Sequence, residues 1–382
     1  MKKSLFSEVS PGAIVSIAGN EIAFVPDSLP PGWEFPGRLW PLLAEAKSQI
    51  GILEGIGRVL PNPGILLRPL EDREAIRSSR LEGTYATPQE LLLFELEPRV
   101  PTSDRDPRND HREVFNYRRA LHLGVNDSRP LCLRLLRDMH RILLDGVRGR
   151  DKNPGNFRNC QVAIGGSRRF VPPPPESVMG CLYEMESYFH VEDSRYDPLV
   201  NCFLMHYQFE AIHPFNDGNG RIGRLLLAIM MQQKCVMTKP WLYLSEFFEQ
   251  HRDEYIDRLF QVSTQAKWSA WVEFCLHATV AQAKATITRC ERLLAIREDF
   301  NGRLNKVGGN VRLYTIMEEI FRSPFIRVSD VPELLGISYP TAKSDMERLA
   351  DAGILKELSG VSPKTYYAPE VFSVAYDELP DS

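Results

Sequence analysis

Apolar residues recur every three to four positions over most of this chain, which is the spacing that buries one face of an α-helix. The pattern predicts helices over about 42–53, 69–81, 111–123, 131–144, 198–212, 221–234, 245–261 and 267–300. Two further helices are expected to begin after Thr87-Pro88, where proline suits the first helical position, and at about Ser177. No internal repeat or low-complexity tract is present, so we expect a mainly α protein.

Three segments depart from this helical spacing. Residues 1–40 are rich in proline and glycine, so we expect an irregular arm packed on a neighbouring part of the fold. Residues 156–170 alternate polar and β-prone side chains around Gly165-Gly166, which predicts a β-hairpin. Residues 172–175 are four prolines, which favour a rigid connector over a proline-rich ligand for a partner domain.

The segment 311–372 has an organisation of its own. Its pattern predicts helices over 313–321, 328–334 and 339–352, with a turn at 336–338 between the last two, and then a strand pair with a turn near 359–363. A helix, a turn, a helix and a two-stranded wing are the outline of a winged helix-turn-helix. We therefore expect three regions: an N-terminal helical region over 1–110, a helical core with the hairpin over 111–300, and a winged-helix domain over 301–382.

Composition narrows the function classes. The 382 residues include 46 Lys and Arg against 50 Asp and Glu, a net charge of −4, which argues against a protein covered by nucleic acid. The longest apolar run, Leu225–Met231, is too short to cross a bilayer, and the N-terminal residues lack the apolar core of a signal peptide. None of the seven cysteines forms a CxxC pair. We expect a cytoplasmic protein with reduced thiols and no membrane contact.

The chemistry is concentrated in twelve residues between two apolar helices, HPFNDGNGRIGR at 213–224. The imidazole of His213 can take a proton near neutral pH. Asp217 is a hard oxygen ligand of the kind that Mg²⁺ on a phosphate requires. Gly218 and Gly220 allow a tight loop whose N–H groups, together with the start of the next helix, form an anion site. Arg221 and Arg224, three residues apart, would clamp phosphates. This set of groups is typical of phosphoryl or nucleotidyl transfer.

The same twelve residues have three simpler interpretations. A calcium loop counted from Asp217 fails, because its twelfth position is Ala228 and not glutamate. A plain interhelical turn accounts for the glycines but not for the histidine or the arginine pair. Taken alone, His213 would more often be a structural histidine than a general base.

The twelve residues match the Fic motif, His-x-Phe-x-Asp/Glu-Gly-Asn-Gly-Arg-x-x-Arg, at every defined position, so the chain resembles Fic-domain proteins. The likeness spans about 40–300, because residues 74–83 (EAIRSSRLEG) resemble the Fic inhibitory helix and the hairpin at 156–170 resembles the Fic flap. A winged-helix tail is a frequent companion of this domain. The resemblance implies a Fic fold: a helical core with a β-hairpin flap.

The resemblance also implies a reaction, the transfer of AMP from ATP to a Ser, Thr or Tyr hydroxyl of a target protein. His213 would be the catalytic base, Asp217 would hold Mg²⁺, and Phe215 would anchor the loop. The flap edge would dock the target as an added strand. The implied nucleotide-binding residues are Gly218, Asn219, Gly220, Arg221, Ile222, Gly223 and Arg224 of the motif, Val162, Ala163, Ile164 and Gly165 of the flap, and Tyr255 near the adenine. An asparagine usual near the base is missing at 261–263, so the base contacts depart from the family pattern.

Glu82 is the implied regulator, with Ser78 one helical turn before it. Its carboxylate would pair bidentately with Arg224 and remove the clamp on the outer phosphates. Some Fic proteins use this glutamate to remove AMP, so the reverse activity stays open. The simpler alternative is a solvated glutamate at a helix end.

Two rival functions remain from the sequence. One is a DNA-binding regulator of winged-helix type in which the core senses a nucleotide, although 311–372 carries seven basic and nine acidic residues. The other keeps the Fic fold but uses a different donor, such as another nucleotide or a phosphocholine carrier. The sequence names neither the target nor the oligomeric state, and a homodimer stays open.

Overall fold

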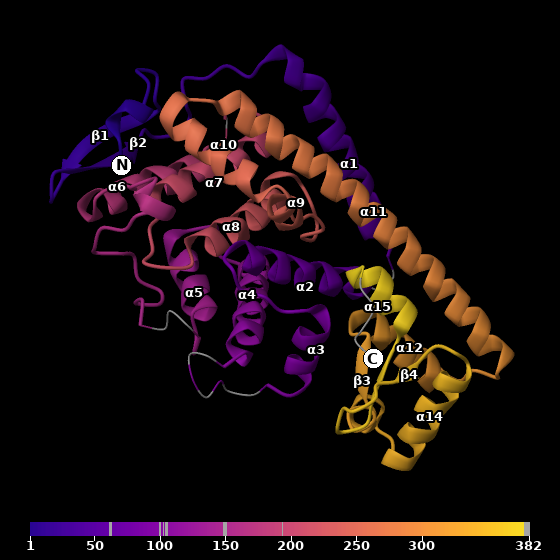
Figure 1. Ribbon diagram of the computed structural model, residues 1–382. Coiled ribbons are helices and arrows are strands. Elements are labelled where there is room, and N and C mark those ends of the chain that lie inside the picture. The colour runs from indigo at the N-terminus through magenta and orange to yellow at the C-terminus, as the bar shows by residue number, and fades with distance from the viewer. Residues whose placement is uncertain are drawn as a thin grey trace.

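The computed structural model describes residues 1–60, 63–98, 101, 103, 106–147, 151–192 and 194–377. Helices dominate these residues, and most of them surround a central antiparallel pair, α7 (Pro198–Ile212) and α8 (Asn219–Lys234) (Figure 1). Around the pair lie α1 (Trp40–Val59), α2 (Gly64–Leu81), α3 (Pro88–Leu96), α4 (Arg108–Asn126), α5 (Leu133–Leu143), α6 (Pro175–Phe189), α9 (Ser245–Gln250), α10 (Arg252–Gln265) and α11 (Trp268–Lys306). The expected mainly α class is confirmed.

Three helices differ from their expected bounds. The helix α2 begins at Gly64, so that Pro69 lies inside it and removes only one hydrogen bond from its first turns. The pattern at 245–261 is divided at His251, whose φ of −116° and ψ of 39° separate α9 from α10. The helix α11 continues to Lys306, past the boundary expected at residue 300, because an exposed helical glycine such as Gly302 costs only about 1 kcal/mol.

The N-terminal arm is not irregular, and that expectation was wrong. Its strands β1 (Gly12–Ile17) and β2 (Glu21–Pro26) form an antiparallel hairpin, with Gly19 and Asn20 at positive φ in the turn. Phe24 is fully buried, its ring lies 5.7 Å from that of Phe170, and its N–H donates to the carbonyl of Val171. The alternation of apolar and polar residues in these strands is short. Because it lies between prolines and glycines, it did not predict strands. The hairpin packs against the end of the flap segment.

The flap itself is shorter than the expected hairpin. Within 156–170 a single antiparallel pair, Ile164 and Phe170, exchanges both main-chain hydrogen bonds, at 2.8 and 3.1 Å. The 3₁₀ turn η3 (Gly166–Arg168) closes the tip. The small antiparallel sheets and this closed turn accompany a helical core, as the expected fold class requires.

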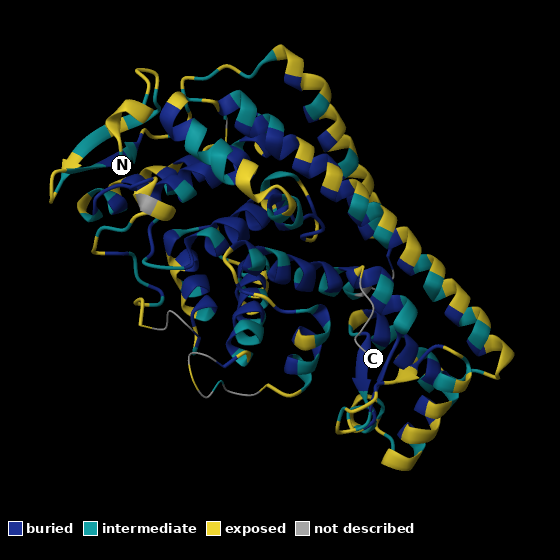
Figure 2. Cartoon of the chain, in the orientation of Figure 1, coloured by how far each residue is buried: buried dark blue, intermediate teal, exposed yellow. Residues whose placement is uncertain are grey.

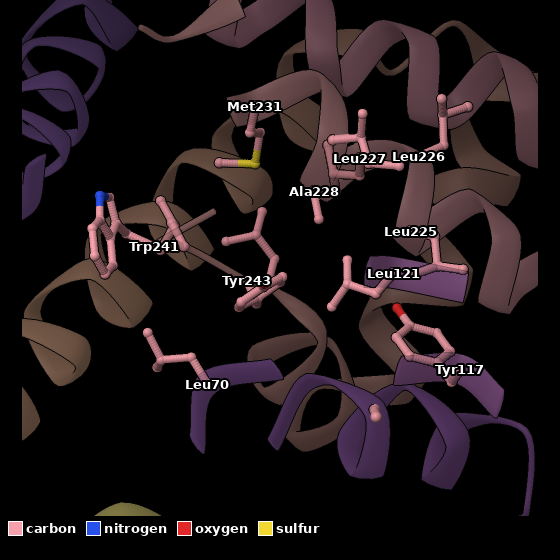
Figure 3. Close-up of a cluster of buried hydrophobic side chains, with 14 of the residues drawn as sticks. Leu70, Tyr117, Leu121, Leu225, Leu226, Leu227, Ala228, Met231, Trp241 and Tyr243 are labelled. Carbon is pink, nitrogen blue, oxygen red and sulfur yellow. The ribbon is translucent and has the colours of Figure 1, made fainter. Parts of the chain in front are cut away.

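The core of the molecule joins α2 to the central pair. Figure 3 shows Leu70 of α2, Tyr117 and Leu121 of α4, and side chains of α8 from Leu225 to Met231 around one buried cluster. Figure 2 shows α7 and α8 buried along almost their whole length. Along α11, exposed residues alternate with buried and intermediate ones. The position of α2 is therefore fixed against the helix that carries the motif arginines.

The C-terminal segment follows the element order expected of it, with additions. It contains α12 (Val311–Arg322), β3 (Phe325–Arg327), α13 (Val331–Leu335), α14 (Tyr339–Asp351), β4 (Lys356–Glu357), β5 (Thr365–Tyr367) and α15 (Pro369–Tyr376). The strands form one antiparallel sheet in the order β3-β5-β4. Both α12 and α15 pack on α2, where the buried hydroxyl of Tyr376 donates to Asp72 at 2.8 Å. The N-terminal half of α2 thus lies under the C-terminal segment.

Two further findings concern the chain as a whole. Within the described residues, no helix combines the length and the apolar character that a membrane crossing needs. All seven cysteines are free thiols, and four of them, at 181, 202, 275 and 290, are buried.

The Tyr376–Asp72 hydrogen bond provides a test of how firmly the C-terminal segment holds α2. Tyr376→Phe removes a buried donor to a carboxylate and should lower the free energy of unfolding by about 1–3 kcal/mol. Tyr314→Phe is the matched control, because its hydroxyl bonds the exposed Asn305, and it should change the same quantity by less than about 0.5 kcal/mol. Urea denaturation of both variants is the measurement. Equal effects of the two substitutions would show that α15 does not stabilise α2.

Candidate active site

The motif loop between α7 and α8 is closed by its own asparagine. Asn219, only 2% exposed, accepts from the N–H of Phe215 and donates to the carbonyl of Phe215, both at 2.8 Å. His213 ends α7 with φ 50° and ψ 61°, and Gly218 precedes α8 with φ 74°. The loop is therefore a tight, internally bonded turn that leaves the N-terminus of α8 facing the site.

His140, a residue that sequence reasoning missed, also supports this loop. Its ring stacks on Phe215 with centroids 3.8 Å apart, and its Nδ1 accepts from the N–H of Gly155 at 2.8 Å. Its Nε2 must then carry the proton, which it donates to the carbonyl of Asp217 at 3.0 Å. Burial lowers the pKa of His140 to about 4, so the ring stays neutral and keeps both bonds.

The proposed base lies in the cavity with little access to water. Burial and the nearby charge of Arg158 lower the pKa of His213 to about 4, while Glu82 acts in the opposite direction. His213 is therefore unprotonated at neutral pH, the form that a proton acceptor needs.

The two motif arginines point to different partners, although they were expected to act as one pair of clamps. Arg224 lines the cavity, whereas Arg221 lies 3.3 Å from the carboxylate of Glu113 and 3.9 Å from that of Asp217. Both side chains are at most 5% exposed. Glu113 was missed by sequence reasoning, because no local pattern links it to a residue 108 positions away.

Glu82 pairs with Arg224, as expected from the sequence, but only one carboxylate oxygen makes the contact. Nη2 of Arg224 donates to Oε1 of Glu82 at 2.8 Å and to the carbonyl of Ser78 at 2.9 Å, and Nε donates to the Ser78 hydroxyl at 2.8 Å. The bidentate carboxylate pair that we expected is therefore a shared arrangement with Ser78. Burial acts to raise the pKa of Glu82, but the charges of Arg224 and Arg221 outweigh it and hold that pKa below 4.5. The carboxylate is ionised at neutral pH.

The same carboxylate covers the start of α8. A methyl group placed on Gly220 would lie 2.3 Å from Oε1 of Glu82 and 2.9 Å from Nη1 of Arg224. A side chain there would have to displace the end of Glu82 or of Arg224. Glu82 therefore stands where the anion site was expected.

A cavity of about 320 Å³ brings most of these groups together. Its lining combines Gly220 and the polar or charged residues Glu82, His213 and Arg224 with the apolar residues Ile164, Phe170, Ile256, Leu259 and Phe260. Tyr207 and Ser263, joined by a 2.9 Å hydrogen bond, lie at the cavity wall. A cavity lined by apolar side chains with a few charged groups suits a nucleotide, which has an apolar base and charged phosphates.

The remaining expected site residues divide into two groups. Gly165 and Tyr255 also line the cavity, and the Tyr255 hydroxyl bonds His206 Nε2 at 2.9 Å. The other group does not line the cavity: Val162, Ala163, Ser78, Asp217, Gly218, Asn219, Arg221, Ile222 and Gly223. Within that group Ile222 is fully buried in the core, so that it supports the loop with its side chain.

Asp217 is the one motif carboxylate available to a metal ion. Its side chain is 45% exposed, and its Oδ1 accepts from the N–H of Gly218 at 2.6 Å. Among the described residues no cluster of three or more His, Cys, Asp or Glu could hold a metal. The donor set therefore fits an ion such as Mg²⁺ that is bound by one carboxylate and by phosphate oxygens.

Glu210 is a second carboxylate that sequence reasoning missed. It lies one turn before His213 on α7 and lines the cavity. Burial, opposed by Arg224, raises the pKa of Glu210 to about 7. Its spacing of three residues from His213 was the available signal, since both then share a helix face.

Comparison with known proteins finds the family that the motif at 213–224 resembles. Residues 40–126 match the Fic/DOC family N-terminal profile, and residues 130–231 match the Fic/DOC family profile. The chain is 31% identical over 179 residues to "Protein adenylyltransferase Fic" of Culex quinquefasciatus, covering 45% of this chain and 33% of the relative. It is 36% identical over 130 residues to "Protein adenylyltransferase fic-1" of Caenorhabditis elegans, covering 32% and 25%. The chain thus spans about a third or less of these relatives' length.

Solved structures share the fold. A Fic family protein from Desulfovibrio desulfuricans G20 aligns with a TM-score of 0.58 at 19% identity, covering 89% of this chain and 98% of that one. The Fic-1 fragment of C. elegans aligns with a TM-score of 0.53 at 20% identity, covering 66% of this chain and 76% of that one.

The buried histidines of the site predict how stability changes with pH. The pKa values of His140, His206 and His213 are lowered to about 4, 3 and 4, chiefly by burial. An unfolded histidine binds its proton near pH 6.5, so the unfolded chain binds more protons below that pH. The free energy of unfolding should therefore fall as pH decreases from 6.5 to 4, by up to about 1.4 kcal/mol per pH unit for each histidine.

His140→Asn tests this dependence. The variant should be less stable at pH 7, and its stability should fall less steeply with acidification, by up to one proton. Urea denaturation at pH 6.5, 5.5 and 4.5 measures the slope. His122→Asn, at an exposed position on α4, is the control and should keep the original slope. An unchanged slope in His140→Asn would mean that this ring is not held neutral.

Proposed function

Because this chain belongs to the Fic/DOC family, we propose that it is a protein adenylyltransferase, which transfers AMP from ATP to a Ser, Thr or Tyr hydroxyl of a target protein. The observation that carries the proposal is the meeting of His213, Gly220 and Arg224 in one cavity that is also lined by apolar side chains. The relatives are named for the same activity.

The chemistry follows from the positions of these groups. A neutral His213 takes the proton of the target hydroxyl as its oxygen bonds to the α-phosphorus of ATP. The bond from that phosphorus to the bridging oxygen breaks, and pyrophosphate leaves with the electron pair. The free N–H groups at the start of α8 stabilise the negative charge that gathers on the α-phosphate. Arg224 holds the outer phosphates once Glu82 has moved away.

Mg²⁺ belongs to the proposal as a partner of the nucleotide. Asp217 is exposed at the mouth of the anion site, and Arg221 beside it is already paired with Glu113, so the Asp217 carboxylate has an oxygen free for a metal. When bound, the ion would supply positive charge that shields the phosphates from the incoming oxygen.

Autoinhibition by Glu82 is the second part of the proposal. Its carboxylate and an outer phosphate compete for the same guanidinium and for the space above Gly220. With Glu82 in place, ATP would lie displaced from the geometry for attack, and transfer would be slow. Removal of AMP by the same residue remains the alternative direction of the reaction.

The alternative of a DNA-binding regulator has less support. On α14, which would be the recognition helix of a winged helix-turn-helix, Lys343 lies 3.8 Å from Glu347, and Arg348 donates to the carbonyls of Val307 and Gly308. Asp345 of the same helix is paired with Arg312. A helix whose cations already have partners presents little charge to phosphates.

The most direct test of the activity uses isotope-labelled ATP and mass spectrometry of the modified protein. The Glu82→Gly chain should add a mass of AMP to itself or to proteins of a cell lysate. His213→Ala in that background should lower the rate by about 10²–10⁴-fold while ATP still binds. Transfer of a different group would identify another donor. Transfer that survives His213→Ala would remove this residue from the role of base.

Asp217→Ala tests the metal role. The variant should need a higher Mg²⁺ concentration for half-maximal transfer and should be slower at every concentration, because one ligand is lost. Asp253, which is exposed on α10 and remote from the motif in sequence, offers the control Asp253→Ala, which should keep the original Mg²⁺ curve. Two superimposable curves for the wild-type chain and Asp217→Ala would exclude the carboxylate as a metal ligand.

The contact between Glu82 and Arg224 is tested by a double-mutant cycle. Glu82→Gly should raise AMP incorporation about ten- to a hundredfold, since a charge-assisted hydrogen bond contributes about 1.5–3 kcal/mol and each 1.36 kcal/mol is tenfold in rate. Arg224→Ala removes the clamp with its blocker and should be slow. The double variant should behave like Arg224→Ala, the non-additivity expected of partners. If Glu82→Gly is no faster than the wild-type chain, Glu82 is not a brake.

A further inference from the structure

Arg158 is a buried arginine at the start of the flap segment that the proposed chemistry does not use. Its residue is 3% exposed, and burial lowers its pKa to about 10, so it is still charged at neutral pH. Within the described part of the chain, every hydrogen-bond acceptor of its guanidinium is a main-chain carbonyl. A buried charge without a counter-ion is costly, so its position calls for a function.

The four carbonyls belong to two separate parts of the site. Nε donates to the carbonyl of His213 at 2.8 Å, and Nη2 donates to that of Ile212 at 3.3 Å. Nη1 donates to the carbonyl of Cys160 at 3.1 Å, and Nη2 also donates to that of Pro173 at 2.5 Å. Cys160 lies in the flap segment 156–170 before its tip, and Pro173 lies in the proline connector that follows the segment. One side chain therefore joins both ends of the flap segment to the end of α7.

These bonds act on the backbone of His213 itself, which has a φ of 50°. A left-handed conformation at a non-glycine residue is unfavourable and persists only where its surroundings hold it. The carbonyls at the end of a helix also carry partial negative charge and lack partners within the helix. The guanidinium satisfies two of these carbonyls, and the N–H of Arg158 donates to the next one, that of Pro214, at 2.8 Å.

The charge of Arg158 also acts on the imidazole. Groups from three elements influence the His213 ring: Arg158 at the start of the flap, Glu82 at the end of α2, and the main-chain carbonyl of Glu210 on α7. Arg158 opposes protonation of the ring, while Glu82 and the Glu210 carbonyl favour it. Movement of Glu82 away from the site would leave the influence of Arg158 dominant among the charges.

We propose that Arg158 is a positioning residue, which fixes His213 in the orientation of a general base and makes the placement of the flap depend on the same side chain. This inference rests on the proposed adenylyl transfer and assigns a further residue to it.

The test separates the geometry of Arg158 from its charge. All variants are made in the full chain with Glu82→Gly, so that the influence of Glu82 is absent throughout. Arg158→Lys keeps the charge but not the four bonds, and Arg158→Gln keeps some donors but not the charge. Arg137→Gln is the matched control, because Arg137 also donates to a carbonyl of this loop, that of Gly155, without reaching α7.

The readouts are kcat and KM for ATP between about pH 3.5 and 8, a range that includes the lowered His213 pKa of about 4. Both Arg158 variants should lower kcat about 10–100-fold, with KM for ATP changed less than about threefold. The acidic limb of the kcat profile should move to higher pH by about one unit in Arg158→Gln and should stay in place in Arg158→Lys. Arg137→Gln should keep both the rate and the limb of its parent.

Either of two results would overturn the inference. One is an unchanged kcat in both Arg158 variants, and the other is the same acidic limb in Arg158→Gln and its parent. The His213 ring titration, followed by NMR and assigned with His213→Ala, gives the same comparison without turnover, and thermal melting shows whether each variant is folded. If the parent itself transfers no AMP, the proposed function fails, whereas a shifted His213 titration would still support the contact with Arg158.

Discussion

One buried guanidinium, that of Arg224, determines the state of this site. It is 3% exposed at the side chain and must have partners at all times, because an unpaired buried cation is strongly unfavourable. In the described structure those partners are the hydroxyl and carbonyl of Ser78 and one oxygen of Glu82. In the proposed function a phosphate replaces only the last of these partners. The rest of the architecture keeps α2 and α8 at the distance at which Glu82 reaches Arg224.

The catalytic loop is held from two sides by residues that do not touch the reacting atoms. His140 stacks under Phe215 and bonds the carbonyl of Asp217, and Arg158 bonds the carbonyl of His213. Both reach the loop from the segment 140–158, which also leads into the flap. The proposed base, the proposed metal ligand and the flap are therefore positioned by one connected set of main-chain contacts, in which a neutral histidine and a charged arginine have different tasks.

Much of this could be predicted from the sequence, because the informative signals are local. The 3.6-residue period located most helices. The motif at 213–224 contains the proposed base, anion site and clamp within twelve residues. The pairing of Glu82 with Arg224 was predicted only through resemblance to a family. The contacts of Arg221 with Glu113, of Arg158 with His213 and of Tyr376 with Asp72 join residues 55 to 304 positions apart. No spacing rule reveals such pairs, since the tertiary fold alone brings them together.

The central claim is that Glu82 and the outer phosphates compete for Arg224, and nucleotide affinity measures it most directly. Isothermal titration of ATP and of AMP into the wild-type chain and into Glu82→Gln compares a ligand that needs Arg224 with one that lacks the outer phosphates. The account predicts that ATP binds about tenfold or more tightly to Glu82→Gln while the affinity for AMP is unchanged. An equal gain for both nucleotides, or none for ATP, would contradict it.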